Sequence, residues 1–274
     1  MSQLLHDIIN SGKPYNLHTH TQFCDGKESM ERIAEKGIEC GLAFLGFTPH
    51  SPIPICSPCN MQKEDVGKYF DEIKRLKEKS RENITILASM EIDYLNRNVG
   101  AHIDYFQKMP LDYRLASVHF VPTQEGVYID CDGSADRFKK NLHEYFHNDL
   151  RYVVEKYYEQ VLTMIETGGF DLLGHFDKIA QNASTIDDEI EDYGWYVSLI
   201  EDVVRNARDR NLIIEINTKY FLEKNRFFPS TKWWNLLNEN DLIAINTDAH
   251  QSGKLLSGKE EATELLKQLK INRI

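Results

Sequence analysis

The chain has 274 residues, of which 41% are hydrophobic, and this is enough for one large domain with a substantial core. Acidic residues outnumber Lys and Arg by 43 to 32, and the net charge of −11 argues against non-specific nucleic-acid binding. No apolar run has membrane-spanning or signal-peptide length, and the five cysteines lack a disulfide-framework spacing. We therefore expect one cytoplasmic domain, residues 1–274, that binds neither nucleic acid nor membrane, and we leave its oligomeric state open.

Short apolar runs alternate with longer amphipathic segments along the chain. The runs that we predict to be strands are residues 15–20, 42–51, 84–94, 113–120, 170–177, 211–218 and 242–250. The predicted helices are residues 27–41, 66–80, 136–167, 190–210, 233–240 and 258–269. Strands that alternate with helices predict a parallel sheet. Seven strands predict an irregular barrel, because eight is the usual number.

Each predicted strand ends in a side chain that can bind metal or another polar ligand. In chain order these residues are His18 and His20, His50, Glu91, His119, His175, Asn217, and Asp248 with His250. The carboxyl ends of parallel barrel strands meet at one rim, so these side chains are expected to converge there. Imidazoles and carboxylates are costly to gather unless a cation pairs them. The ligand types predict divalent Zn, Mn or Fe.

The number of candidate ligands predicts more than one metal. With Asp25 included there are nine, which exceeds what a single ion uses, so we expect two or three ions with shared carboxylates. Clustered divalent metals suit phosphoester hydrolysis, because they generate hydroxide near neutral pH and neutralise phosphate oxygens. The general acid for the leaving group is not evident from the sequence.

Six short motifs occur in an order and spacing that resemble the PHP (polymerase and histidinol phosphatase) superfamily, histidinol-phosphate phosphatase type. They are "HTHTQFCDG", "GFTPHS", "MEIDY", "SVHF", "LLGHFD" and "TDAH", and the resemblance covers residues 15 to 255. It implies an α/β fold, a distorted (β/α)7 TIM-like barrel with a trinuclear metal centre at the C-terminal rim of the strands. Some relatives have histidine where this chain has Asp25.

The resemblance also implies a ligand set. One metal would be held by His18, His20, Glu91 and Asp248, with Glu91 bridging to a second metal on His119 and His175; Asp25, His50 and His250 would hold the third. A metal-bridging hydroxide would hydrolyse L-histidinol phosphate to L-histidinol and phosphate, a step of histidine biosynthesis. The alternative is another PHP phosphoesterase that acts on a nucleotide or another small phosphate ester.

Three further residues are predicted to bind substrate. The resemblance favours Arg226 for the phosphate, since a guanidinium matches phosphate oxygens, and Lys219 and Lys224 share its loop. Lys178 is a second phosphate candidate. Asp93 shares a strand face with Glu91 and is a candidate partner for the histidinol cation, or a support for a metal ligand.

Two other motifs allow a metal interpretation, and we assign both to structural roles. "HEYFH", from His143 through Glu144 to His147, matches the zinc-protease pattern, but it lies on the flank of a helix expected to coat the barrel. Cys56 and Cys59 lie on a proline-rich loop beside His50, which we predict to be a lid or wall over the substrate. A non-catalytic metal-binding module is the remaining alternative.

Overall fold

The computed structural model describes residues 3–269, so residues 1–2 and 270–274 of the expected domain lie outside the described part. The strands are β1 (Tyr15–Asn16), β2 (Phe44–Phe47), β3 (Thr85–Ala88), β4 (Glu91–Asp93), β5 (Leu115–Ser117), β6 (Phe120–Pro122), β7 (Tyr128–Asp130), β8 (Leu172–Leu173), β9 (Ile213–Asn217) and β10 (Ile243–Asn246). The α-helices are α1 (Gln3–Asn10), α2 (Met30–Glu39), α3 (Val66–Ser80), α4 (Asp104–Gln107), α5 (Ala135–Phe146), α6 (Leu150–Thr167), α7 (Ile179–Ala183), α8 (Gly194–Asp209), α9 (Phe221–Lys224) and α10 (Lys259–Gln268). The 3₁₀ helices are η1 (Lys63–Asp65), η2 (Ile190–Asp192), η3 (Thr231–Leu236) and η4 (Ser252–Lys254).

The parallel strands form a ring that is held at two places by only a single bridge between neighbouring strands. They pair as two sheets, ordered β1-β2-β3 and β10-β9-β8-β5-β4. Isolated parallel bridges join the sheets, one between Thr19 and Ala249 and the other between His50 and Glu91. The run 84–94 changes partner along its length, because β3 pairs with β2 whereas β4 pairs with β5. The seven predicted strand runs are thus neighbours in chain order, which confirms the α/β fold and the expected irregularity.

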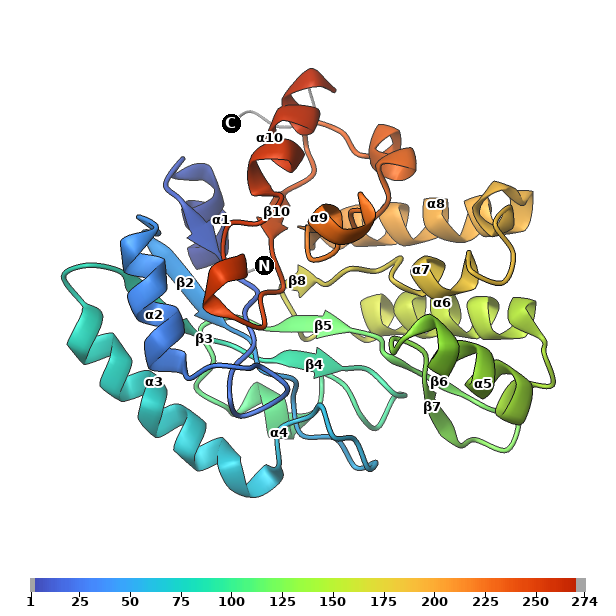
Figure 1. Cartoon of the computed structure of the whole chain (residues 1–274), viewed down its shortest axis with the longest axis horizontal. Helices are drawn as coiled ribbons and strands as arrows, with labels where there is room; N and C mark the ends of the chain where they lie inside the picture. The colour runs from blue at the N-terminus through green and yellow to red at the C-terminus, as the bar shows by residue number, and fades with distance from the viewer. Residues whose placement is uncertain (1–2, 270–274) are drawn as a thin grey trace.

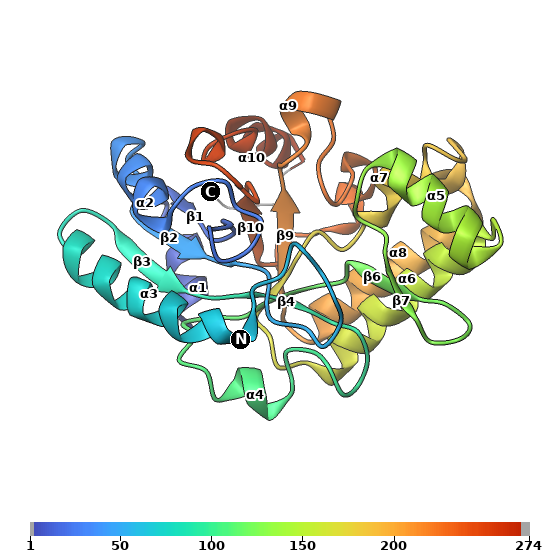
Figure 2. The ribbon, with the colours of Figure 1, turned by 60° about the horizontal axis from the view of Figure 1, so that its bottom comes forward.

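The helices cover the outside of the strands. In Figures 1 and 2, α2 and α3 lie on one side of the strands and α5, α6 and α8 lie on the opposite side. Helix α2 begins where Ser29 accepts a hydrogen bond from the Arg32 backbone N–H at 3.2 Å. It buries one stripe of apolar side chains, which includes Met30 and Ile33, while its charged face meets solvent.

The long helical region predicted over residues 136–167 is present, but the structure divides it into two helices. His147 and Asn148 adopt left-handed backbone angles, with φ of 51° and 62°, and this ends α5. Asp149 then caps α6 by accepting a hydrogen bond from the Tyr152 backbone N–H at 2.9 Å. The apolar repeat continues across the break, so periodicity alone did not reveal it.

Other departures are shorter elements. The antiparallel hairpin β6–β7 was not predicted, nor was α1. The helix predicted over residues 190–210 begins as η2 and becomes α-helical only from Gly194. The helix predicted over residues 233–240 is instead the 3₁₀ helix η3. Within residues 3–269, no helix combines the length and the apolar character needed to cross a membrane.

Candidate metal centre

The nine predicted metal ligands lie together at the carboxyl ends of the strands. They form four overlapping groups whose ligand atoms lie within 4.8 Å of one another, and Asp93 is the additional member. The groups are His20, Asp25, His50 and His250; His18, Glu91 and His175; His18, His20 and Asp248; and His50, Asp93 and His119. The barrel thus joins side chains from the whole length of the chain, as the strand-end pattern predicts.

Glu91 is fully buried at the centre of this cluster. Its Oε1 lies 2.8 Å from His175 Nε2 and 3.4 Å from His119 Nε2. On the other side, Oε2 lies 3.4 Å from both His18 Nε2 and His20 Nε2. Among residues 3–269, neither carboxylate oxygen of Glu91 has a hydrogen-bond partner. One carboxylate therefore presents its two oxygens to two different sets of imidazoles, which is the geometry of a bridging ligand.

Asp248 closes the cluster from the end of β10. Its Oδ1 lies 2.9 Å from His20 Nε2 and 3.4 Å from His250 Nδ1. Its φ is 48°, which is an unfavourable backbone angle for a residue other than glycine. Such angles persist where the surrounding structure enforces them, and they concentrate at functional sites.

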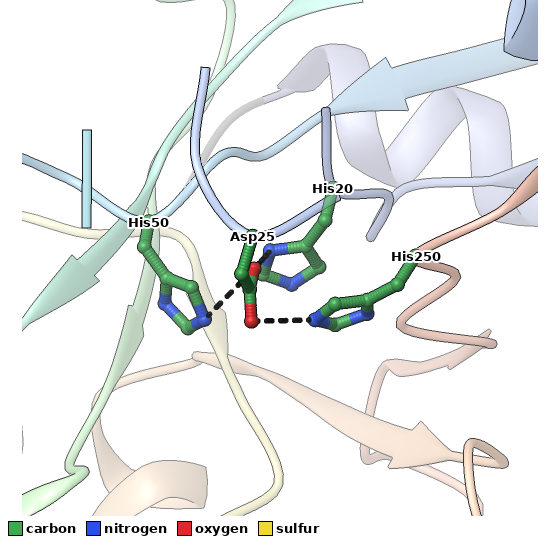
Figure 3. A group of neighbouring side chains, drawn as sticks. All are labelled: His20, Asp25, His50 and His250. Atoms are coloured by element: carbon green, nitrogen blue, oxygen red, sulfur yellow. Dashed lines mark hydrogen bonds and ion pairs between the residues drawn. The ribbon is translucent and has the colours of Figure 1, made fainter. Parts of the chain in front are cut away.

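Figure 3 shows the outer part of the cluster, where Asp25 lies among three imidazoles. Asp25 Oδ1 lies 3.4 Å from His20 Nδ1 and 3.8 Å from His50 Nε2, and Oδ2 lies 3.2 Å from His250 Nε2. The rings of His20 and His250 stack with their centroids 4.0 Å apart. A carboxylate with three imidazole nitrogens offers ligands typical of a divalent transition metal.

Two buried carboxylates orient the histidines from behind. Glu215 Oε1 lies 2.8 Å from His18 Nδ1, and Asp93 Oδ1 lies 2.6 Å from His119 Nδ1. These hydrogen bonds leave the Nε2 atoms to face the centre. Sequence reasoning missed Glu215, although a lone acid within the apolar run "LIIEIN" was a usable signal. Asp93 also accepts a hydrogen bond from Asn60 Nδ2 at 2.7 Å, so both of its oxygens are engaged within the protein.

The charges and unpartnered atoms of the cluster fit bound metals. Burial raises the pKa of Glu91, but the surrounding imidazoles outweigh that effect and hold this pKa well below its usual range. Burial lowers the pKa of His18, but the three carboxylates around it raise this pKa to about 9. Within the described part of the chain, the buried atoms His119 Nε2, His175 Nε2 and Asp25 Oδ1 lack hydrogen-bond partners. Buried polar atoms without partners indicate an ion or water at that place.

The predicted substrate residues do not all face the cluster. A cavity of about 590 Å³ opens over it and is lined by Lys219, His50 and His250 among others, but not by Arg226. Arg226 instead donates two hydrogen bonds of 2.9 Å to Glu191. Lys178 is buried and lies 2.8 Å from Asp132 and 3.7 Å from Asp248 Oδ2. Lys178 does not line the cavity either, but it lies beside Asp248, a predicted metal ligand, whereas Arg226 pairs with Glu191.

The HEYFH motif and the pair Cys56 and Cys59 lie outside the groups of potential metal ligands found among residues 3–269. Among residues 3–269, the groups of potential metal ligands include neither His143 nor His147. His147 has left the helix, since it forms the left-handed end of α5, and the two histidines no longer share a helical face. Cys56 and Cys59 are free thiols, and Cys59 lines the cavity. The role of their loop as a lid or wall over the substrate stays a prediction.

A parallel barrel with histidines and carboxylates at its carboxyl rim defines a class of metal-binding α/β barrels. Within that class, the chain belongs to the PHP domain family, whose model matches residues 16–219. This confirms the resemblance drawn from the six motifs.

Several proteins that are similar to this chain are named histidinol phosphatases. A Schizosaccharomyces pombe protein named "Probable histidinol-phosphatase" is 27% identical over 252 residues, which cover 86% of this chain and 80% of that protein. A Lactococcus lactis histidinol phosphate phosphatase, complexed with zinc, L-histidinol and phosphate, aligns with a TM-score of 0.69, 21% identity and 94% coverage of each chain. A Listeria monocytogenes structure, hisK, aligns with a TM-score of 0.78 and 19% identity over 90% of this chain and 99% of that chain. At these identities, the solved structures confirm the fold.

Proposed function

We propose that the chain is a metal-dependent phosphomonoesterase that hydrolyses L-histidinol phosphate to L-histidinol and phosphate in histidine biosynthesis. The observation that carries this proposal is the position of Glu91, whose two oxygens face imidazoles from different strands. The substrate is supported by the name of the S. pombe relative and by the histidinol and phosphate bound to the L. lactis enzyme. The cavity of about 590 Å³ is of the size that takes a small molecule.

We assign the ligands to two or three divalent ions, with Zn, Mn and Fe as the candidates. His18, His20, Glu91 and Asp248 would hold one ion; Glu91, His119 and His175 a second; and Asp25, His50 and His250 a third. When bound, such ions supply the positive charge that stabilises a phosphoester undergoing hydrolysis. The third set lies within one group of neighbouring ligand atoms, and the first contains another such group. The second set is supported by the distances from Glu91 Oε1 to His175 Nε2 and His119 Nε2, 2.8 and 3.4 Å.

The residues of the chain hold this arrangement in place. Glu215 and Asp93 fix the tautomers of His18 and His119, so that each Nε2 faces the centre. Lys178, held by Asp132, adds a buried positive charge beside Asp248. We propose that Lys178 contributes to phosphate binding and that Asp93 acts as a support for His119. Arg226 as a phosphate ligand and the cytoplasmic location stay predictions.

Phosphate release from a panel of small phosphomonoesters tests the proposal. The protein is loaded separately with Zn, Mn and Fe, and metal content is measured on the same samples. We expect L-histidinol phosphate to have the highest kcat/KM in the panel. A nucleotide hydrolysed in preference would favour the alternative PHP phosphoesterase. No release from any ester by fully loaded protein would contradict the enzyme and favour a metal-binding module.

A further inference from the structure

Lys219 lies on a stretch of backbone that is fixed at the end of β9. Its backbone N–H donates to Asn217 Oδ1 at 3.0 Å. The preceding residue, Thr218, donates its N–H to the Asn246 carbonyl at 2.9 Å. The loop that follows is closed at its base, where the backbones of Asn217 and Phe228 exchange hydrogen bonds of 2.7 and 3.0 Å. These hydrogen bonds therefore fix the backbone position of Lys219 at the end of β9.

The Lys219 ammonium reaches the predicted metal ligands from the cavity side. Its Nζ lies 3.2 Å from Asp248 Oδ1 and 3.4 Å from His250 Nε2. The side chain lines the cavity and is 23% exposed, so a ligand in the cavity can contact it. Lys178 approaches the other oxygen of Asp248, at 3.7 Å, from within the barrel. Asp248 therefore lies between two ammonium groups, of which Lys219 is the one that meets the cavity.

We propose that Lys219 binds the phosphoryl group of the substrate at the open side of the metal centre. The inference rests on the proposed function, since it names a residue that recognises that substrate. A phosphate bound through ions on Asp248 and His250 would lie within reach of Nζ, which is 3.2 Å from Asp248 Oδ1 and 3.4 Å from His250 Nε2. An ammonium suits this position, because it is a compact charge that needs no bidentate geometry. Binding would exchange the contacts of Lys219 with its neighbours for contacts with the phosphate.

The contacts of Arg226 explain why a lysine takes this role. The Arg226 guanidinium donates to both oxygens of Glu191 at 2.9 Å, and its Nη2 also lies 3.5 Å from Asp177 Oδ2. These contacts tie the loop after β9 to η2, at the edge of the barrel. Arg226 is therefore committed to holding the loop that carries Lys219.

The test compares Lys219→Met with Lys219→Arg and with a matched control, Lys224→Met. Lys224 is on the same loop and lines the same cavity, but it is exposed and lies 5.0 Å from the Tyr220 ring centre. Binding of inorganic phosphate to each metal-loaded protein is measured by calorimetry, together with metal content and with kcat and KM for L-histidinol phosphate.

Loss of one charge-assisted contact in Lys219→Met should weaken phosphate binding by about tenfold to a hundredfold. We expect Lys219→Arg to restore part of this loss and Lys224→Met to stay within about twofold of the wild type.

Three outcomes would overturn the assignment. In the first, the metal-loaded wild type binds no phosphate. In the second, Lys219→Met binds phosphate as well as the wild type does. In the third, Lys219→Met has lost metal, and its weaker phosphate binding is explained by that loss. Calorimetry with inorganic phosphate does not depend on turnover. If the wild type fails to hydrolyse L-histidinol phosphate but needs Lys219 to bind phosphate, the proposed function fails and the role of Lys219 stands.

Discussion

Buried acids set the orientation of the histidines at this site. Glu215 is fully buried, and besides His18 it accepts hydrogen bonds from the His175 backbone N–H at 3.0 Å and from Asn246 Nδ2 at 3.0 Å. Every one of these partners is at, or next to, a strand end of the metal centre. A single residue that no motif includes thus links three strands around the cluster.

Replacing Glu215 by Gln should lower metal affinity by about 10- to 100-fold, because loss of the carboxylate weakens its hold on His18 Nδ1. Competition with a chelator measures the change, with Glu155→Gln as the control. Glu155 is an exposed acid on α6 that pairs with Arg151 at 2.8 Å, and it belongs to no group of potential metal ligands among residues 3–269. Equal metal affinity in the Glu215→Gln and control proteins would show that Glu215 does not support the site.

His143→Ala should leave phosphate release within about twofold of the wild type, because His143 lies outside every metal group of residues 3–269. His175→Ala, by contrast, should lose both metal and activity, since His175 Nε2 faces Glu91 Oε1 at 2.8 Å. Both variants are assayed for phosphate release and for protease activity. A protease activity of the wild type that His143→Ala abolishes would revive the zinc-protease interpretation.

At the residue level, the sequence predicted the convergence of the candidate ligands better than it predicted the contacts around them. Histidines at the ends of apolar runs are visible as a pattern, because the barrel geometry makes every strand end equivalent. The pairing of Arg226 with Glu191 is not visible, because it depends on how two separate loops pack. The role of Arg226 as a phosphate ligand stays a prediction, and in this structure its guanidinium is paired with Glu191.

Short elements explain most of the differences between the predicted and observed folds. β6 and β7 have three residues each, too few for an alternating pattern to stand out. The run 84–94 was predicted as one strand, and its change of partner between β3 and β4 depends on tertiary packing. The longer helices α2 and α3 followed their periodicity closely. Their apolar stripes were long enough for the pattern to specify them.

Strand β2 has no space for a side chain at Gly46. A Cβ at Gly46 would lie 1.9 Å from the Tyr113 hydroxyl oxygen, which donates a 2.5 Å hydrogen bond to the Leu17 carbonyl beside His18. Gly46→Ala should therefore destabilise the protein by about 1–3 kcal/mol or more, as measured by urea unfolding. Gly67→Ala, on α3 with no atom within 4 Å of the added Cβ, is the matched control and should stabilise by about 0.5–1 kcal/mol. A Gly46→Ala protein as stable as the wild type would contradict this packing.

At the scale of the whole molecule, the metal centre joins elements from both ends of the chain. The bridge between Thr19 and Ala249 joins the two sheets at one place, and the bridge between His50 and Glu91 joins them at the other. Both bridges lie at the rim where the ligands gather. Bound ions would therefore reinforce the barrel where its strand pairing is weakest.

Metal removal should accordingly lower thermal stability. Ions present at about 100 times their dissociation constant stabilise the folded state by about 2.7 kcal/mol per site, which is roughly 5–10 °C in Tm for a chain of this size. Melting curves are recorded for the protein as purified, after chelation, and after metal is restored. Restoration should return the original Tm, and a Tm that is indifferent to chelation would contradict a structural contribution from the ions.

The central claim is that side chains at the strand ends, contributed by segments along the length of the chain, bind several metal ions around Glu91. An anomalous-diffraction map of the metal-loaded protein tests it most directly. The account predicts two or three peaks, one between Glu91 and His175 and one between His20 and Asp248, with their ligands at about 2.0–2.2 Å. A map with no peak beside Glu91, from crystals whose metal content has been verified, would contradict it.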